Sequence, residues 1–386
     1  MKRIYLDCAA TTPADPEVVR SMSPYFSGVY GNPSSMHSLG YEARAAVEDA
    51  RAVVAGALGA RPYEIVFTSG GTESDNAAIK GVAFANRSRG NHLIASAVEH
   101  HAVLESCAFL EKNGFSVTYL PVDGEGLVAP DDVRKAITSR TVLISVMHAN
   151  NEIGTMQPVG EIGAIAREAG IYFHTDAVQT FGHLPFTASD LQADLLSVSA
   201  HKLYGPKGVG ALFIREGTRI GPFMHGGNQE KGRRASTHNV PGIVGFGKAV
   251  EIASGGVGEE QQRLTRLRDR LINGVIENIR HARLNGHARL RLPGNAHFSF
   301  TNAEGELLLH ALDKRGIACS TGSACSAEST GPSHVLLSLG LPHHLVTGSL
   351  RFSLCKYTTE EDIDHLLAVL PEVVREVRSL SPFREC

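Results

Sequence analysis

A lysine and an aspartate each stand where an apolar segment of the chain ends. Lys202 follows the segment DLLSVSAH (194–201), and Asp176 lies at the end of IYFHTDA (171–177), with Gln179 three residues further on. A lone lysine there commonly emerges into water, and a lone aspartate commonly caps a helix. The pair also matches another need: a lysine forms a Schiff base with pyridoxal phosphate, and a carboxylate keeps its pyridine nitrogen protonated. We interpret the pair as the centre of such a site.

A glycine-rich turn is a candidate phosphate site. The segment FTSGGTESDN (67–76) is typical of a strand that runs into a turn at Gly71 and Thr72 before a helix begins. Free backbone N–H groups at the start of a helix attract anions, because they lie at the positive end of the helix dipole. The turn matches neither the G-x-G-x-x-G pattern of dinucleotide sites nor the P-loop, which disfavours both alternatives. Since most such turns bind nothing, this one supports a phosphate site only together with Lys202.

Two adjacent histidines, His100 and His101, follow another apolar segment. Adjacent side chains of a regular element cannot both face one ligand, and the H-E-x-x-H motif of zinc enzymes is absent, so a metal pair is disfavoured. The functional interpretation is that one imidazole stacks on an aromatic cofactor. The alternative is a pair that faces solvent.

The segment STGSACSAEST (320–330) surrounds Cys325 with small residues and serines. The six cysteines of the chain form no C-x-x-C pair, which fits neither a zinc module nor a secreted disulfide scaffold. Considered alone, Cys325 is most simply a free surface thiol. Gly322 and Gly331 nevertheless make a flexible loop reasonable, and an exposed, deprotonated thiol on such a loop is a nucleophile.

Short β-branched segments alternate with longer amphipathic ones, which predicts an α/β fold with a mostly parallel sheet. The last strand follows its predecessor after too few residues for a parallel crossover, so we expect it to be antiparallel. The seven strands predicted for this sheet are 64–70, 92–97, 117–122, 141–149, 171–177, 194–201 and 209–215.

The sequence pattern changes near residue 250, where a second domain is expected to begin. The Gly-rich segment 253–260 is the best linker candidate, and the charged stretch 259–282 has apolar residues at helical spacing. Beyond it we expect a strand within 289–300, a strand around SLRFSL, and a final helix over 360–380. Together these elements predict a smaller α+β unit.

The composition of the 386-residue chain is that of an ordinary soluble globular protein, with 42% hydrophobic residues and a net charge of -3. This charge gives no reason to propose nucleic acid or a membrane as a partner. The start of the chain has no sustained apolar region, and no run of about 18 apolar residues occurs, so we expect neither a signal peptide nor a membrane span. The scattered thiols favour the reducing cytoplasm.

Taken together, the motifs resemble those of group I cysteine desulfurases of the NifS and IscS type, in the same order and over nearly the whole chain. The matching segments are YLDCAATTP, YGNPSSMH, FTSGGTESDN, VEHHAV, MHANNEIGTMQPV, HTDAVQ, SAHKLYGPKGVGAL, HGGNQEKGRR, STGSACSAE and SLRFSL. The resemblance implies a fold-type I pyridoxal phosphate transferase that forms a homodimer. It also implies a large cofactor-binding domain at 15–252 and a small domain made of 1–14 and 253–386, which carries the Cys325 loop.

The resemblance also assigns roles to individual residues. Lys202 would be attached to the cofactor, Asp176 would pair with the pyridine nitrogen, and Gln179 would bond the phenolic oxygen. His100, counted among the catalytic residues with Lys202 and Cys325, falls at the ring-stacking position. An arginine fork suits a carboxylate, so the substrate would be held by Asn151, also a cofactor contact, and Arg351. The residues implied to hold the phosphate are Gly71, Thr72, Ser199 and His201, with Thr237 from the neighbouring subunit.

The implied reaction is the desulfuration of L-cysteine. Lys202 would remove the α-proton, and the Cys325 thiolate would attack the substrate's Sγ, giving L-alanine and a persulfide on Cys325. The sulfur would pass to iron–sulfur cluster assembly or to another sulfur-transfer pathway through a scaffold or acceptor protein. No intrinsic metal site is implied, although Cys325 would be available as a transient ligand of a cluster on such a scaffold.

Three alternatives remain open. A selenocysteine lyase, or a related class V pyridoxal phosphate lyase, shares most of these motifs, whereas a class V aminotransferase would have no use for the Cys325 loop. An interaction scaffold for sulfur delivery is the third alternative, and the presence of Lys202, Asp176 and Cys325 argues against it.

The chain departs from the family pattern at two places. Ser236 stands where the family usually has glycine before Thr237, so a backbone with positive φ would be strained there. Cys355 and Lys356 stand where the family usually has Gly-Arg. The second departure either alters the wall of the substrate pocket or adds a second thiol near the site.

Overall fold

The computed structural model describes residues 3–322 and 331–380, so Cys325 lies outside the described residues. The described part contains a seven-stranded sheet with the order β2-β8-β7-β6-β5-β3-β4. All seven predicted strands are confirmed, with shorter bounds: β2 Ile65–Thr68, β3 His92–Ser96, β4 Ser116–Leu120, β5 Thr141–Ser145, β6 Tyr172–Asp176, β7 Leu195–Ser199 and β8 Gly210–Ile214.

The sheet is mostly parallel, as predicted. Strands β4, β3, β5, β6 and β7 pair in parallel, whereas β8 is antiparallel to both of its neighbours, β7 and β2. The carboxyl ends of the parallel strands therefore meet at one edge of the sheet, where α/β proteins commonly bind ligands.

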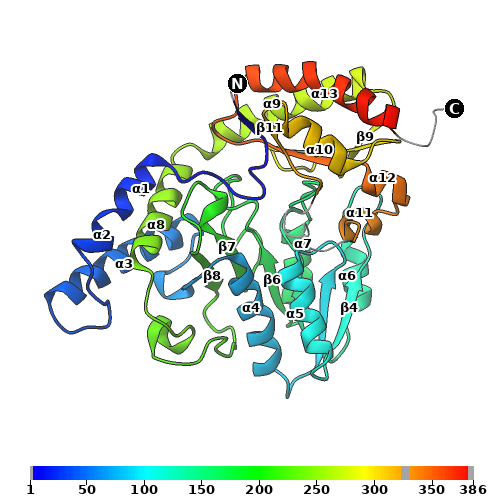
Figure 1. The fold of residues 1–386 in the computed structure, drawn as a ribbon. Coiled ribbons are helices and arrows are strands. Elements are labelled where there is room, and N and C mark those ends of the chain that lie inside the picture. The colour runs from blue at the N-terminus through cyan, green and yellow to red at the C-terminus, as the bar shows by residue number, and fades with distance from the viewer. Residues whose placement is uncertain (1–2, 323–330, 381–386) are drawn as a thin grey trace.

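Helices cover both faces of this sheet (Figure 1). Because consecutive strand residues point to opposite faces, Leu195 packs with the apolar side chains of α4 and α5, while Leu196 packs with those of α3, α7 and α8. The helices that precede residue 255 are α1 Pro16–Met22, α2 Pro24–Ser27, α3 Ser38–Ala57, α4 Gly71–Ala85, α5 His101–Glu111, α6 Pro130–Ala136, α7 Val159–Glu168 and α8 Val240–Ser254.

A second core lies around an antiparallel sheet of order β12-β10-β9. Its strands are β9 Ala282–Asn285, β10 Asn295–Phe300 and β12 Ser349–Ser353, and its main helices are α9 Val257–Asn278, α10 Gly305–Asp313 and α13 Glu360–Leu380. Strand β1, Ile4–Tyr5, pairs in parallel with β11, Ile317–Ala318, which brings Ile4 and Leu6 into this core. Figure 1 shows this group above the large sheet, with α11 His334–Ser338 and α12 His343–Thr347 between them.

The predicted break and final helix are confirmed. Helix α8 ends at Ser254 and α9 begins at Val257, inside the predicted linker segment, and α13 occupies the predicted range 360–380. The long helix predicted over 259–282 ends at Asn278, because the chain turns there into β9. No described helix is both long and apolar enough to span a lipid bilayer.

The prediction for the end of β7 was wrong. The strand ends at Ser199, and Ala200–Lys202 form a short 3-10 turn, η2. His201 and Lys202 therefore do not follow strand alternation. The turn directs both side chains, together with Ser199, to one cavity. Other 3-10 turns are η1 Pro62–Glu64 and η3 Gln229–Gly232.

Candidate active site

One cavity, at the carboxyl ends of the parallel strands, collects most of the predicted site. Five lining residues of the described part were not predicted from the sequence: Ala9, Ala10, Asp75, Met147 and Val178. The predicted residues that line it are Gly71, Thr72, His100, Asn151, Asp176, Gln179, Ser199, His201, Lys202 and Arg351. Thr237 is exposed and does not line this cavity, and Cys325 lies outside the described residues.

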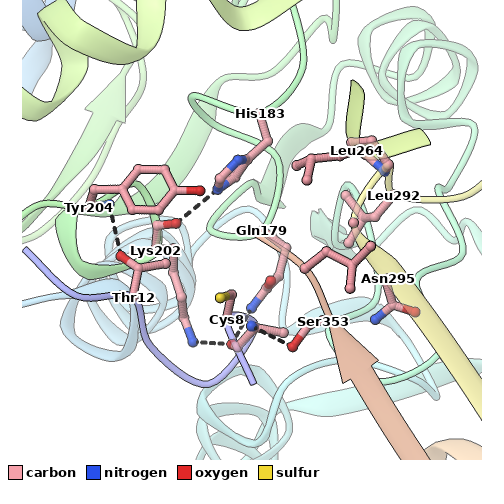
Figure 2. A pocket seen from close by; sticks show the side chains of 14 residues that line it. Cys8, Thr12, Gln179, His183, Lys202, Tyr204, Leu264, Leu292, Asn295 and Ser353 are labelled. Carbon is pink, nitrogen blue, oxygen red and sulfur yellow. Dashed lines mark hydrogen bonds between the residues drawn. The ribbon is translucent and has the colours of Figure 1, made fainter. Parts of the chain in front are cut away.

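The lysine side chain is anchored by the N-terminal segment. Lys202 Nζ donates hydrogen bonds to the carbonyl oxygens of Ala9 and Ala10, at 2.5 and 2.7 Å, and Gln179 Nε2 donates to the Ala9 carbonyl at 3.1 Å. Figure 2 shows Lys202 and Gln179 pointing toward this segment from different elements. Sequence reasoning missed Ala9 and Ala10, because they act through backbone carbonyls and have no informative side chain.

Asp176 is the last residue of β6, and the turn that follows holds its side chain. Its Oδ1 accepts a hydrogen bond from the Val178 backbone N–H at 2.8 Å. Burial raises the pKa of Asp176 to about 6, although the Val178 N–H and the charge of Lys202 act in the opposite direction. A positively charged group in the cavity would therefore bind here with little competition from water.

Asp75 is a second acid in the cavity that sequence reasoning did not identify. It is buried on α4, and its Oδ1 has no hydrogen-bond partner among the described residues. Burial and the charge of Asp176 raise its pKa well above the usual range. The available signal was its spacing, because Asp75 follows Thr72 by three residues and so shares a helix face with it.

The glycine-rich turn has the form that an anion needs. Helix α4 begins at Gly71 without a capping side chain, so its first N–H groups keep their capacity to donate. A Cβ on Gly71 would lie 2.8 Å from Val178 Cγ2, so the close approach of the two segments favours glycine. Ser199 Oγ is buried without a hydrogen-bond partner in the described part of the chain. These donors converge on the cavity that contains Lys202.

The two histidines occupy different environments. His100 is the N-cap of α5: its Nδ1 accepts from the Ala102 N–H at 3.1 Å and its ring lines the cavity. Burial, together with the charge of Lys202, lowers the pKa of His100 to about 4, so the ring is neutral. His101 is instead paired with His334, with 4.7 Å between ring centroids.

Arg351 is buried on β12 and faces the same cavity. Its Nη1 donates to the Asn151 carbonyl at 2.9 Å, and its Nη2 lies 2.8 Å from Asp7 Oδ1. The Nε has no partner among the described residues. The arginine is thus fixed in position by two of its five N–H donors, and the other three remain for a ligand.

Comparison with known proteins identifies the family. The model of the class-V aminotransferases matches residues 4–366. A cysteine desulfurase IscS from Dictyoglomus turgidum is 56% identical over 386 residues, covering 100% of this chain and 98% of the relative. The chain belongs to the cysteine desulfurases of the class-V aminotransferase family. The resemblance seen in the motifs is therefore confirmed.

Solved structures support the cysteine desulfurase fold. A NifS-like protein matches with a TM-score of 0.91 at 40% identity, over 97% of this chain and all of the other. A structure of SspA in complex with cysteine matches with a TM-score of 0.81, also at 40% identity, over 93% of this chain and all of the other. The predicted fold-type I architecture is confirmed by these likenesses.

The cavity fits the cofactor of cysteine desulfurases. Pyridoxal phosphate needs a lysine, a carboxylate for its ring nitrogen, and donors for its phosphate. Lys202, Asp176 and the turn at Gly71 line one cavity, and the partnerless Ser199 Oγ is the kind of buried donor that a phosphate oxygen satisfies. Within residues 3–322 and 331–380, no group of three or more His, Cys, Asp or Glu side chains is arranged to hold a metal ion.

The two departures from the cysteine desulfurase pattern have defined places in the fold. Ser236 has a φ of 95°, the positive value that strains a residue other than glycine. Cys355 is buried in contact with Cys8 and Tyr204, and it does not line the cavity that contains Arg351. Of the two alternatives for Cys355, the structure therefore favours a second thiol near the site.

Proposed function

We propose that the protein removes sulfur from L-cysteine, leaving L-alanine and a persulfide on Cys325. The observation that carries this proposal is the convergence of Lys202, Asp176 and Arg351 on one cavity, in a chain whose relatives are named cysteine desulfurases. The similar protein SspA was solved in complex with cysteine, which supports the same substrate here.

Pyridoxal 5'-phosphate is the proposed cofactor. When bound, it supplies an electron-poor ring that accepts the electrons left on the substrate's α-carbon. Asp176 would hold the ring nitrogen, Gln179 the phenolic oxygen, and His100 would stack on the ring. The proposed phosphate contacts are Gly71, Thr72, Ser199 and His201, and Asn151 is a further cofactor contact.

Within this proposal the chain's own residues bind the substrate and move its protons. Arg351 and Asn151 orient the substrate carboxylate, and Lys202 Nζ takes the α-proton. His100 is neutral, because burial lowers its pKa to about 4, so it adds no positive charge beside Lys202. The Cys325 thiolate bonds to the substrate's Sγ as the Sγ–Cβ bond breaks, and the carbon is then protonated to give alanine.

The proposal extends to the assembly. We propose a homodimer in which Thr237 completes the partner's phosphate site, because Thr237 is exposed and does not line the cavity of its own chain. We also propose a division into a large domain, 15–252, and a small domain, 1–14 and 253–386. The seven-stranded and the three-stranded sheet each have their own apolar core, which supports this division. A cytoplasmic scaffold or acceptor in iron–sulfur assembly would receive the sulfur, with Cys325 available as a transient cluster ligand.

Two variants test the function. The purified protein should absorb near about 420 nm, as a lysine-bound pyridoxal phosphate does, and Lys202→Ala should lose this band. Cys325→Ala should keep the band while persulfide formation from L-cysteine falls at least about 100-fold, because the acceptor is removed. Persistent turnover in Cys325→Ala would contradict the assignment of the acceptor. A strong preference for L-selenocysteine over L-cysteine would instead favour a selenocysteine lyase.

A further inference from the structure

Two thiols that the proposed reaction does not use lie in one buried cluster, at the wall of a cavity that Lys202 also lines. Cys8 follows β1 and Cys355 follows β12, and the segments that carry them run side by side: the Cys8 N–H donates to the Ser353 carbonyl at 3.2 Å. Cys8, Cys355 and Tyr204 form a small buried cluster, with 6%, 4% and 7% of their surfaces exposed. The interaction between these two thiols is the largest influence on the pKa of each.

The surroundings of the two thiols make them unequal. The hydrogen bond from Cys8 lowers the pKa of Cys355 to about 6, and donors from Tyr357 and Thr358 add to this effect against the opposing effect of burial. Thr358 Oγ1 lies 3.8 Å from Cys355 Sγ. The same hydrogen bond and burial raise the pKa of Cys8 well above its usual range. The two thiols are therefore unequal, with Cys355 the more easily ionised of the pair.

A small molecule has a route to Cys8, behind which Cys355 lies in the same buried cluster. Cys8 lines a second cavity that adjoins the first, because Ala9, Gln179 and Lys202 line both. Figure 2 shows Cys8 and Lys202 among the side chains that line this cavity. The other two cysteines of the described part, Cys107 and Cys319, have raised pKa values of about 12 through burial. A low pKa and access together distinguish a reactive cysteine from an inert one. Here the lowered pKa belongs to Cys355 and the access to Cys8, so the pair combines the two properties that neither thiol has alone.

We propose that Cys8 and Cys355 form a redox-active dithiol, which a hydroperoxide converts into an intramolecular disulfide and a thiol reductant restores. The Cys355 thiolate attacks one peroxide oxygen and the O–O bond breaks, giving a sulfenic acid on Cys355 and hydroxide. The Cys8 sulfur then bonds to the Cys355 sulfur and displaces the sulfenic oxygen as water, with the Cys8 proton. The two sulfurs together lose two electrons, and the peroxide gains them.

The disulfide would displace the N-terminal segment whose backbone carbonyls accept hydrogen bonds from Lys202. Cys8 directly precedes Ala9, whose carbonyl accepts from Lys202 Nζ and whose N–H donates to Ser353 Oγ at 2.9 Å. A covalent bond holds two sulfurs at about 2 Å, much closer than a hydrogen-bonded contact, so its formation must move this segment. Oxidation should therefore reduce the ability of Lys202 to move a proton, a consequence that rests on the proposed function.

The disulfide itself is tested without reference to activity. The holoprotein carrying Cys325→Ser and Cys386→Ser is treated with hydrogen peroxide, blocked with a thiol-alkylating reagent, and digested without reduction. We expect a cross-linked peptide pair containing Cys8 and Cys355 and a loss of two free thiols, both reversed by dithiothreitol. Adding Cys355→Ser or Cys8→Ser should abolish the cross-link, whereas the matched variants Cys107→Ser and Cys319→Ser should keep it. Each variant is first compared with its parent by thermal melting.

Two outcomes would overturn the proposal. In the first, Cys8 and Cys355 of a correctly folded protein are both still free thiols after peroxide treatment, so that both are alkylated. In the second, Cys355 is oxidised to the sulfinic acid without any cross-link.

The effect on Lys202 is measured separately, as exchange of the α-proton of L-alanine with deuterium oxide, which needs no Cys325 and adds no thiol. We expect oxidation to slow this exchange at least about fivefold and reduction to restore it. Absence of exchange in the reduced protein would count against the proposed function and leave the disulfide result intact.

Discussion

Arg351 Nη2 lies 2.8 Å from Asp7 Oδ1, and this pair joins β12 to the segment that holds Lys202. The arginine side chain is 1% exposed and the aspartate side chain 17% exposed, so the pair is shielded from water. A shielded charge without its partner is strongly destabilising, because nothing replaces the lost hydration. Asp7 therefore keeps Arg351 in place at the cavity wall.

This pairing predicts a measurable coupling. Asp7→Asn should lower the free energy of unfolding by about 2 kcal/mol, because it leaves the Arg351 charge uncompensated. The double variant Asp7→Asn/Arg351→Met should be destabilised by at least about 1 kcal/mol less than the sum of the two single changes. Denaturant unfolding measures all four proteins. Asp132→Asn, which breaks the exposed pair with Lys135, is the control and should change stability by less than about 0.5 kcal/mol. If the changes in the free energy of unfolding caused by Asp7→Asn and Arg351→Met simply added in the double variant, the two residues would not be coupled.

Ser199 and Ser197 make a matched pair of buried serines on β7. Ser199 Oγ has no partner among the described residues, so Ser199→Ala should leave the melting temperature of the cofactor-free protein unchanged or higher. The same change should weaken pyridoxal phosphate binding by roughly tenfold or more, the equivalent of one hydrogen bond to a charged group. Fluorescence titration of the apoprotein with the cofactor measures this affinity.

Ser197→Ala is the opposite case. Ser197 Oγ lies 3.0 Å from His174 Nε2, and both residues are fully buried. Its removal should destabilise the apoprotein by about 1–3 kcal/mol, because the imidazole loses a buried partner. If Ser199→Ala destabilised the apoprotein as much as Ser197→Ala, the interpretation of Ser199 as a ligand donor would be wrong.

Glu99 should make stability depend on pH. Burial raises its pKa to about 8, against the effect of hydrogen bonds from Ser96 and the Met147 N–H. The folded protein therefore holds this proton at pH values where the unfolded chain has lost it, and stability falls as the pH rises from about 4.5 to about 8. Glu99→Gln removes the ionisable group while keeping an acceptor. Its melting temperature should thus exceed that of the unmodified protein by an increment that grows up to about pH 8.

The control for this experiment lies on α5, the helix that follows Glu99 in the sequence. Glu105 is exposed on α5, so Glu105→Gln should shift the melting temperature equally at pH 5 and pH 8. A Glu99→Gln increment that did not change between these pH values would show that Glu99 is not protonated in the folded protein.

Ser236 is a site where a single change should stabilise the protein. Its φ of 95° is costly for a residue with a Cβ, and its side chain is exposed. Ser236→Gly should raise the free energy of unfolding by on the order of 1 kcal/mol, since the relief of backbone strain exceeds the added freedom of the unfolded chain. Ser236→Ala keeps the Cβ and should give no such gain. Equal effects of the two variants in thermal melting would contradict a backbone origin.

Local sequence pattern was sufficient for the large sheet and for several residues that line the cavity of the candidate site. The seven strands are apolar and bounded by turns, and the antiparallel β8 followed from a connection too short for a crossover. Asp176, His100 and Ser199 lie at or just after strand ends, where a parallel sheet must bring them to one edge. The family motifs then named Arg351 and Asn151, which no local pattern singles out.

Only the tertiary structure could decide which groups meet across distant parts of the chain. The carbonyls of Ala9 and Ala10 hold Lys202 through backbone atoms, which leave no trace in side-chain type. The 3-10 turn at Ala200–Lys202 replaces the strand end expected there, because the chain must turn all three site residues into one cavity. Cys8 and Cys355 lie at opposite ends of the sequence, and the pairing of the first residues with β12 places both in one buried cluster. Residue type and spacing determine local elements, whereas contacts between elements depend on packing over the whole chain.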